Sequence, residues 1–221
     1  MTAEGPSERA PGETVVSTIR HGLTELNRDQ RVGGRLDVPL LEAGREQARQ
    51  AGAVFTSRGV DVVVVSPLRR AIETAELVTH WRRSSFEIDE LCTERSFGEM
   101  EGIDPAEVPT RFPMVEYLRI EDIGYSLNPP GGETFEELHE RAHRFVDGLI
   151  ARHAGRSIVV FSHQNFLQQM HAVLRAMGPK EALEYDILNC ELNEFRLGAD
   201  RGLLDHRVRQ LVASAGDHAS F

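Results

Sequence analysis

The sequence predicts an α/β fold, a three-layer α/β/α sandwich around a mostly parallel central sheet with a lid insertion. Two short runs, residues 62–65 and 158–161, are apolar throughout, as expected for parallel strands that are covered on both faces. Strand-like and helix-like segments alternate along the chain, which is typical of βαβ units. Three apolar runs are each followed within five residues by basic or imidazole side chains, at Arg20-His21, Arg69-Arg70 and His163. Sheets of this kind bind ligands beyond the carboxyl ends of their strands.

Hydrophobic periodicity places the individual elements. Strands are expected at 14–20, 61–65, 86–89 and 157–161, with two further strand-like segments at 187–197 and 203–211. Helices are expected at about 41–57, from near Pro67 onward, at 133–153 and at 164–177. Proline suits a first helical turn because its missing N–H has no helical partner there.

The chain is expected to form one domain, because 221 residues with 40% hydrophobic content can build a single core. That domain covers residues 14–212. The polar segments 1–13 and 213–221 are expected to be flexible tails. Residues 91–132 combine prolines with aromatic side chains and methionines, and they are interpreted as a lid over the strand ends.

Charge and cysteine content limit the partners and the compartment. A net charge of −10 argues against a nucleic-acid partner, which needs a basic face. Cys92 and Cys190 form no CxxC pattern, which favours a reducing compartment. The first eight residues lack the apolar region of a signal peptide, and no apolar run approaches the roughly 18 residues of a membrane span. We therefore expect a cytoplasmic protein without a membrane partner; its oligomeric state is open, a homodimer included.

The side chains at the strand ends predict a pocket for a phosphate monoester. Arginine binds a phosphate dianion through two parallel hydrogen bonds, and Arg20 and Arg70 are the candidates. Asn27 can donate a neutral hydrogen bond to the same oxygens. The helix that begins near Gln164 can add backbone N–H groups, since helix N-termini favour anions.

The same pocket contains a candidate nucleophile. A neutral imidazole at His21 can attack phosphorus and form a phosphohistidine, and Gly22 keeps side-chain bulk away from the phosphate. His163 is expected to be a cationic clamp on the transferring group. Glu94 is the candidate general acid, which gives the leaving oxygen its proton from beneath an apolar lid.

These residues resemble the motifs of the histidine phosphatase (phosphoglycerate mutase-like) superfamily. The segment from Arg20 to Asn27 resembles its RHGxTxxN signature, and the segment from Ser66 resembles its SxLxRAxxTA motif, with Arg70 rather than Arg69 at the matched position. Glu94 begins a segment like the acid-donor segment. Residues 131–134 resemble its GGES-type loop, and Ser162-His163 resembles the second-histidine motif. The five motifs occur in family order over about residues 15–170.

The resemblance implies the three-layer fold, a phosphohistidine on His21 and phosphoryl binding by Arg20, Arg70 and His163. It implies neither a cofactor nor a metal requirement, and the expected partner is a small phosphomonoester substrate. One departure stands out: Gln164 follows the second histidine, where family members usually carry glycine. Its side chain is expected to narrow the pocket or to contact the substrate.

Three neighbouring signals have plainer readings. His139-Glu140-Arg141-Ala142-His143 matches the zinc-protease pattern HExxH, but a pattern this short arises by chance. The two histidines are expected beside the buried stripe of their helix, as surface residues. Arg69 is interpreted as a surface charge. Glu133 is interpreted as a carboxylate that stabilises the helix N-terminus, with the alternative that it also faces the site.

Three functions remain in view, of which a metal-independent phosphatase is preferred. A phosphoglycerate-type mutase has to hold a second anionic group, yet residues 94–128 carry eight acidic side chains against three arginines. This balance favours a substrate whose remainder is uncharged, apolar or cationic. A catalytically inactive binding module is the third reading, although such a module has no need of His21, Arg70, Glu94 and His163 together.

Overall fold

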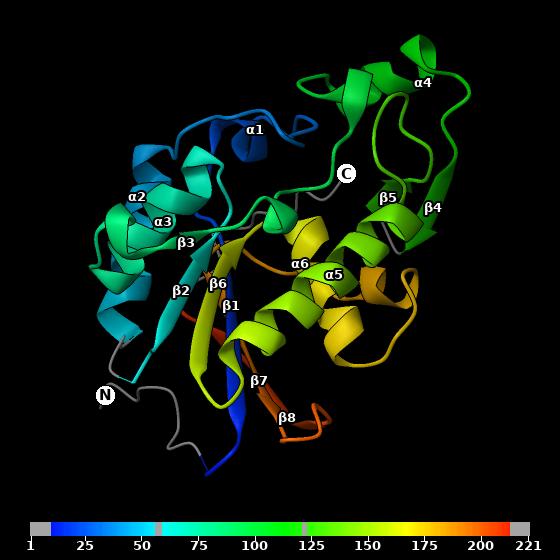
Figure 1. Ribbon diagram of the computed structural model, residues 1–221. Coiled ribbons are helices and arrows are strands. Elements are labelled where there is room, and N and C mark those ends of the chain that lie inside the picture. Colours follow the sequence, from blue (N-terminus) through cyan, green and yellow to red (C-terminus); the bar gives the residue numbers. More distant parts are fainter. Residues whose placement is uncertain (1–9, 56–58, 121–122, 213–221) are drawn as a thin grey trace.

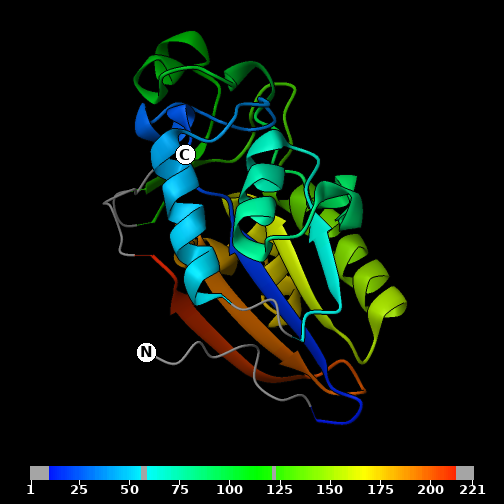
Figure 2. The ribbon, with the colours of Figure 1, turned by 90° about the vertical axis from the view of Figure 1, so that its left-hand side faces the viewer.

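A six-stranded sheet forms the centre of the molecule and is covered by helices on both faces (Figures 1 and 2). The computed structural model describes residues 10–55, 59–120 and 123–212. The predicted tails therefore lie largely outside the described residues. In sheet order the strands are β3 (Glu87–Ile88), β2 (Val62–Val65), β6 (Ser157–Ser162), β1 (Thr14–Arg20), β7 (Glu191–Leu197) and β8 (Leu203–Gln210).

The direction of the strands confirms the predicted mostly parallel sheet. Strands β3, β2, β6 and β1 are parallel to one another, whereas β7 is antiparallel to β1 and β8 is antiparallel to β7. Because β7 reverses direction, the segment just before it lies at the same edge of the sheet as the end of β1. That segment becomes part of the site described below.

Four of the described helices lie close to their expected positions, and two short ones, residues 25–28 and 108–111, were not predicted from the sequence. In chain order the helices are α1 (Glu25–Arg28), α2 (Glu42–Val54), α3 (Arg69–Thr79), α4 (Val108–Arg111), α5 (Phe135–His153) and α6 (Gln164–Leu174). The predicted start of α3 is wrong by two residues. Leu68 is the N-cap, with extended backbone angles, and Pro67 precedes it outside the helix.

The sheet divides the core into two apolar layers. Alternate residues of β2 and β6 point to opposite faces: Val62 and Ile158 pack with α5 and α6, whereas Val63 and Val159 pack with α2 and α3. Since both faces are covered, the strands need no polar positions. This explains the continuous apolar runs and fixes the strand ends that form the site.

The segment 91–132 consists of two parts. Its first part packs Phe97, Met100 and Val108 against Val32, in a small apolar cluster of its own. Its second part forms a hairpin of β4 (Tyr117–Ile120) and β5 (Ile123–Ser126) that packs beside α5 (Figure 1). Short 3₁₀ turns connect these elements, as they do after α3 and α6, at Arg83–Ser85, Glu90–Cys92, Gly98–Met100, Pro105–Glu107 and Glu181–Glu184.

A buried histidine between α6 and the sheet predicts a loss of stability in acid. His171 Nε2 lies 2.8 Å from Thr18 Oγ1, and burial, followed by His206 and Arg175, lowers the pKa of His171 to about 3. In the unfolded chain this pKa is near 6.5, so unfolding below pH 6.5 takes up a proton. The contribution of His171 to the free energy of unfolding should therefore be fully present above pH 6.5. It should decrease toward pH 3, by up to about 1.4 kcal/mol per pH unit.

Urea unfolding of the His171→Gln variant between pH 7 and pH 4 measures this contribution. The variant should lose stability less steeply with falling pH than the wild type, although His21 and His163 add to the slope in both proteins. Replacing exposed His143 by Gln is the matched control and should leave the slope unchanged. Equal slopes for His171→Gln and the wild type would contradict the assignment.

Candidate active site

Three neighbouring strands end at one edge of the sheet, and the residues after them form a pocket. The strand register pairs Arg20 with Ser162 and Val65 with Phe161, so β2, β6 and β1 end side by side. Of the predicted site residues, the pocket is lined by Arg20, His21, Asn27, Arg70, Glu94 and Gln164. His163 lies beside them, with its ring centroid 5.2 Å from that of His21. The structure thus brings together every residue that the sequence placed in the site.

The imidazole of His21 is held in one tautomer. Its Nδ1 lies 2.7 Å from the carbonyl oxygen of Gly22, which can only accept a hydrogen bond, so Nδ1 carries the proton. Its Nε2 then carries the lone pair and accepts a hydrogen bond from Arg70 Nε at 3.2 Å. Burial first, and then Arg70 and Arg20, lower the pKa of His21 well below its ordinary value of 6.5. Near neutral pH, His21 therefore presents an uncharged nucleophilic nitrogen.

Arg70 is a buried cation between the two histidines. Its Nε donates to both His21 Nε2 and His163 Nδ1, each at 3.2 Å. Its terminal nitrogens donate to the carbonyl oxygens of Leu36 and Gly34, at 2.6 and 2.7 Å. Burial lowers the pKa of Arg70 to about 10, against the opposing effect of Glu94, so the guanidinium stays charged at neutral pH.

His163 is fully buried and differs from expectation in its charge. Its Nδ1 accepts from Arg70, and its Nε2 lies 2.7 Å from Ser66 Oγ, which fixes the ring. Burial, then Arg70 and His21, lower the pKa of His163 well below its ordinary value. In this arrangement the ring is neutral near pH 7, and not the cation that the sequence suggested, because burial first, and then the neighbouring arginines and His21, disfavour a charge on it.

Arg20 and Asn27, which also line the pocket, carry further hydrogen-bond donors. Arg20 is buried, and its Nη1 donates to the carbonyl oxygen of Ile187 at 2.6 Å. Asn27 belongs to a capping box, in which its Oδ1 accepts from the backbone N–H and the hydroxyl of Thr24. With the oxygen turned toward Thr24, the NH₂ group of Asn27 is the part that can donate to an anion in the pocket.

Glu94 occupies the N-terminus of α6. Its Oε1 accepts from the backbone N–H groups of Arg95 and Phe166, at 2.8 and 3.1 Å, and its Oε2 lies 3.4 Å from the N–H of Asn165. The expectation that these helix N–H groups bind phosphate is wrong for Asn165 and Phe166. A side-chain carboxylate takes the anion position that the helix N-terminus offers, and this orients Glu94 at the pocket wall.

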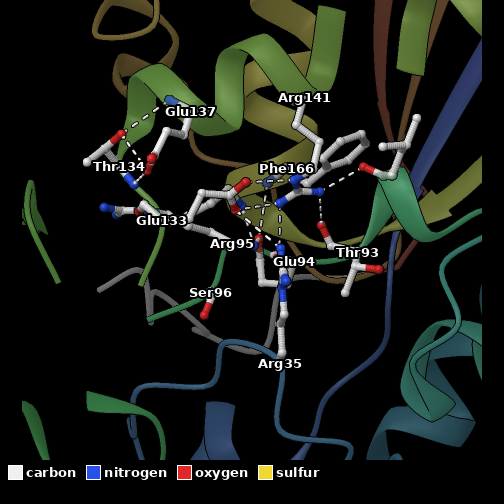
Figure 3. Close-up of polar contacts among 12 residues, drawn as sticks. Arg35, Thr93, Glu94, Arg95, Ser96, Glu133, Thr134, Glu137, Arg141 and Phe166 are labelled. Carbon is white, nitrogen blue, oxygen red and sulfur yellow. Dashed lines mark hydrogen bonds and ion pairs between the residues drawn. The ribbon is translucent and has the colours of Figure 1, made fainter. Parts of the chain in front are cut away.

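Gln164 lines the pocket, and its side-chain amide donates to Asp186 Oδ1 at 2.6 Å. Two further expectations need correction. A Cβ on Gly22 would lie 2.6 Å from the carbonyl oxygen of Gly44, so the glycine serves the close approach of α2. Glu133 faces Arg141, to which it is bound through both carboxylate oxygens, rather than the pocket (Figure 3).

The acidic balance of residues 94–128 does not describe the pocket. Two of its eight acidic side chains lie outside the described residues, and of the six that are described only Glu94 lines the pocket. Glu101 accepts from the N–H groups of Phe97 and Arg35. Arg31, by contrast, contributes a guanidinium to the lining. The charge balance of residues 94–128 therefore does not support an uncharged, apolar or cationic remainder of the substrate.

Sequence reasoning missed the residues that hold the nucleophile and the clamp. Ser66 positions His163, Thr74 Oγ1 accepts from the N–H of Gly22, and Asn189 Nδ2 donates to the carbonyl oxygen of His21. Ser66 follows a predicted strand and carried the same positional signal as the histidines. Asn189 could be found only by recognising that β7 is antiparallel.

The HExxH pattern is part of the surface of α5. His139 Nδ1 lies 2.9 Å from Gln169 Oε1, and the exposed ring of His143 packs edge-on against His139. Over the ranges that the structure describes, no three His, Cys, Asp or Glu side chains are grouped as metal ligands. Arg69 is exposed and pairs with Glu73 at 2.7 Å, as a surface charge.

The fold and these motifs can now be compared with known proteins. The family model for the histidine phosphatase superfamily (branch 1) matches residues 16–209. The chain belongs to this superfamily. Relatives of this chain include a bifunctional protein of Mycobacterium tuberculosis, 32% identical over 185 residues, and a 2,3-bisphosphoglycerate-dependent phosphoglycerate mutase of Cytophaga hutchinsonii, 27% identical over 177 residues.

Coverage differs between these relatives. The alignment includes 82% of this chain but 50% of the mycobacterial protein, so the chain spans half the length of that relative. For the mutase the shares are 78% and 83%. A solved structure from Escherichia coli, a putative alpha-ribazole-5'-P phosphatase, superposes with a TM-score of 0.76 at 23% identity and covers 91% of this chain and all of that one. The likeness establishes the fold of the chain. The described helices are too short or too polar to be transmembrane segments.

Proposed function

We propose that the protein is a metal-independent phosphatase that hydrolyses a small phosphomonoester through a phosphohistidine on His21. One observation carries this proposal: the lone pair of a neutral His21 lies 3.2 Å from the Arg70 guanidinium, in a pocket that Glu94 also lines. A phosphoryl group held by Arg70 and Arg20 would lie against the nucleophile, with a proton donor at the opposite end of the reacting bond.

The reaction takes two steps, and His21 and Glu94 act in both. In the first, His21 Nε2 forms a bond to phosphorus as the bond to the leaving oxygen breaks, and Glu94 gives that oxygen its proton. In the second, Glu94 takes a proton from water, the water oxygen attacks phosphorus, and the bond to His21 breaks. Inorganic phosphate leaves, and Glu94 is protonated again. Arg70 and Arg20 balance the phosphoryl charge in both steps.

A quench experiment tests the covalent intermediate. The protein is mixed for milliseconds with [³²P]-labelled p-nitrophenyl phosphate in the presence of EDTA and stopped in alkali, where a phosphorus–nitrogen bond survives. After proteolysis we expect label on the peptide that contains His21 and none on the peptide with His143. Label that survives acid but not alkali, or none at all during active turnover, would contradict the phosphohistidine.

A phosphoglycerate-type mutase is the second candidate, and Arg31 is the observation that favours it. Arg31 lines the pocket, and its Nη1 donates to the carbonyl oxygen of Gly102 at 3.0 Å. A carboxylate or second phosphate on the substrate could bind there. Incubation with a phosphorylated hydroxy acid separates the two functions: a phosphatase releases inorganic phosphate stoichiometrically, whereas a mutase yields the positional isomer. If the positional isomer forms and no inorganic phosphate is released, the protein is a mutase and the phosphatase proposal is wrong.

The proposal also covers the inactive-module alternative, the compartment and the partners of the protein. An inactive binding module is disfavoured because nucleophile, guanidinium clamp and candidate acid meet in one pocket. The two buried cysteines are free thiols in the described chain, which agrees with a reducing compartment and supports a cytoplasmic location. We propose a small-molecule substrate and no nucleic-acid or membrane partner.

A further inference from the structure

We propose that Arg141, on α5, is a positioning residue for the acid–base carboxylate of Glu94. The inference rests on the proposed function, in which Glu94 protonates the leaving oxygen. Arg141 is 6% exposed and is not one of the residues that line the pocket. Its contacts converge on the segment that carries Glu94.

The guanidinium of Arg141 binds the main chain before and at Glu94. Its Nη1 donates to the carbonyl oxygens of Leu91 and Thr93, both at 2.7 Å, and its Nη2 donates to the carbonyl oxygen of Glu94 at 3.2 Å. This segment has little regular structure, since only the short turn Glu90–Cys92 precedes Glu94. The buried guanidinium therefore supplies the hydrogen bonds that a helix or strand would otherwise provide.

Glu133 fixes the plane of that guanidinium. Its two carboxylate oxygens accept from Arg141 Nε and Nη2, each at 2.7 Å, which is the paired geometry of a carboxylate with arginine. The main chain of Glu133 is tied to the same segment, because its N–H donates to Ser96 and its carbonyl oxygen accepts from Arg95. Rotation of Arg141 would break several of these bonds together.

Arg141 also contacts the group that orients the carboxylate itself. The guanidinium lies 5.3 Å above the ring of Phe166, whose backbone N–H donates to Glu94 Oε1. Arg141 thus holds both the main chain of Glu94 and the helix start to which its side chain is bound. Arg35 reaches the same carbonyl of Glu94 from the solvent side, but its side chain is 45% exposed and less constrained.

Two roles for this cluster predict different kinetics. If Arg141 only stabilises the fold, its replacement reduces turnover of all substrates alike. If it positions Glu94, the loss depends on how much the leaving oxygen needs a proton. The matched substrates are p-nitrophenyl phosphate, which has a good leaving group, and p-nitrobenzyl phosphate, which releases a poorly acidic alcohol.

The decisive variant is Arg141→Lys, which keeps the charge but cannot bind Glu133 and three carbonyls at once. We expect its kcat/KM for p-nitrobenzyl phosphate to fall roughly tenfold or more beyond any loss on p-nitrophenyl phosphate. Glu133→Gln should show the same selectivity to a smaller degree, and it serves if Arg141→Lys does not fold. Arg144→Lys, exposed on the same helix, should change neither value.

Comparison with Glu94→Gln separates the failure of this inference from the failure of the proposed function. If Glu94→Gln lowers kcat/KM equally for both substrates, Glu94 is not the general acid. The positioning role of Arg141 is then contradicted as well. Selective loss for Glu94→Gln but equal losses for Arg141→Lys and Glu133→Gln would overturn the positioning role alone. Selective loss in all three variants, with circular dichroism unchanged, supports it.

Discussion

Replacing His21 by alanine should lower the turnover of every phosphomonoester substrate by roughly 10⁴-fold or more, the scale seen when a covalent nucleophile is removed. The neighbouring imidazole of His163 does not replace it. The ring of His163 is fully buried and is not part of the pocket lining, whereas His21 lines the pocket, and the Nε2 of His163 lies 2.7 Å from Ser66 Oγ. The remaining activity should come from phosphate binding and general-acid catalysis alone.

The measurement is steady-state turnover of p-nitrophenyl phosphate, together with circular dichroism and thermal unfolding. His143→Ala is the control, because His143 is exposed and far from the strand ends in sequence. It should behave like the wild type. A folded His21→Ala variant that keeps a tenth or more of the wild-type rate would show that another group attacks phosphorus.

Most of the fold follows from local patterns in the chain. The runs 62–65 and 158–161 are apolar at every position because the helices of both layers bury them, and this made them recognisable as parallel strands. The reversal of β7 has no such local signal. Its direction depends on which edge of the sheet is free and on the turn before it, where Cys190 adopts a positive φ of 57°. The predicted start of α3 is too early because Leu68, the residue after Pro67, has extended backbone angles and is the N-cap of the helix.

The site was predictable where position along a strand determined it. His21, Arg70 and His163 meet because parallel strands end at one edge, and that rule needs no tertiary detail. The partners of Glu94 could not be predicted in this way. The N-terminus of α6 can bind either a substrate phosphate or a carboxylate from the chain, and only the path of residues 91–95 decides between them. The pairing of Glu133 with Arg141 depends on that same path.

Replacing Arg70 by lysine should lower kcat/KM by roughly 10²- to 10³-fold, although the charge is kept, because the planar fork makes contacts that one ammonium cannot. In the structure Arg70 binds two carbonyl oxygens with its terminal nitrogens while its Nε faces both histidines. An ammonium has to choose between the carbonyls and the phosphoryl group. The affinity for inorganic phosphate as a competitive inhibitor should fall as well.

The same substitution should also cost stability, since the carbonyl oxygen of Gly34 loses its buried donor, at about 1–3 kcal/mol for such a group. Activity and urea unfolding are therefore measured on the same samples. Arg69→Lys is the matched control, because Arg69 precedes Arg70 on the first turn of α3 but is exposed and pairs with Glu73. It should keep both properties within about twofold in rate and 0.5 kcal/mol in stability. If Arg70→Lys loses stability but binds inorganic phosphate as tightly as the wild type, Arg70 is a support for the loop at Gly34 and does not hold the phosphoryl group.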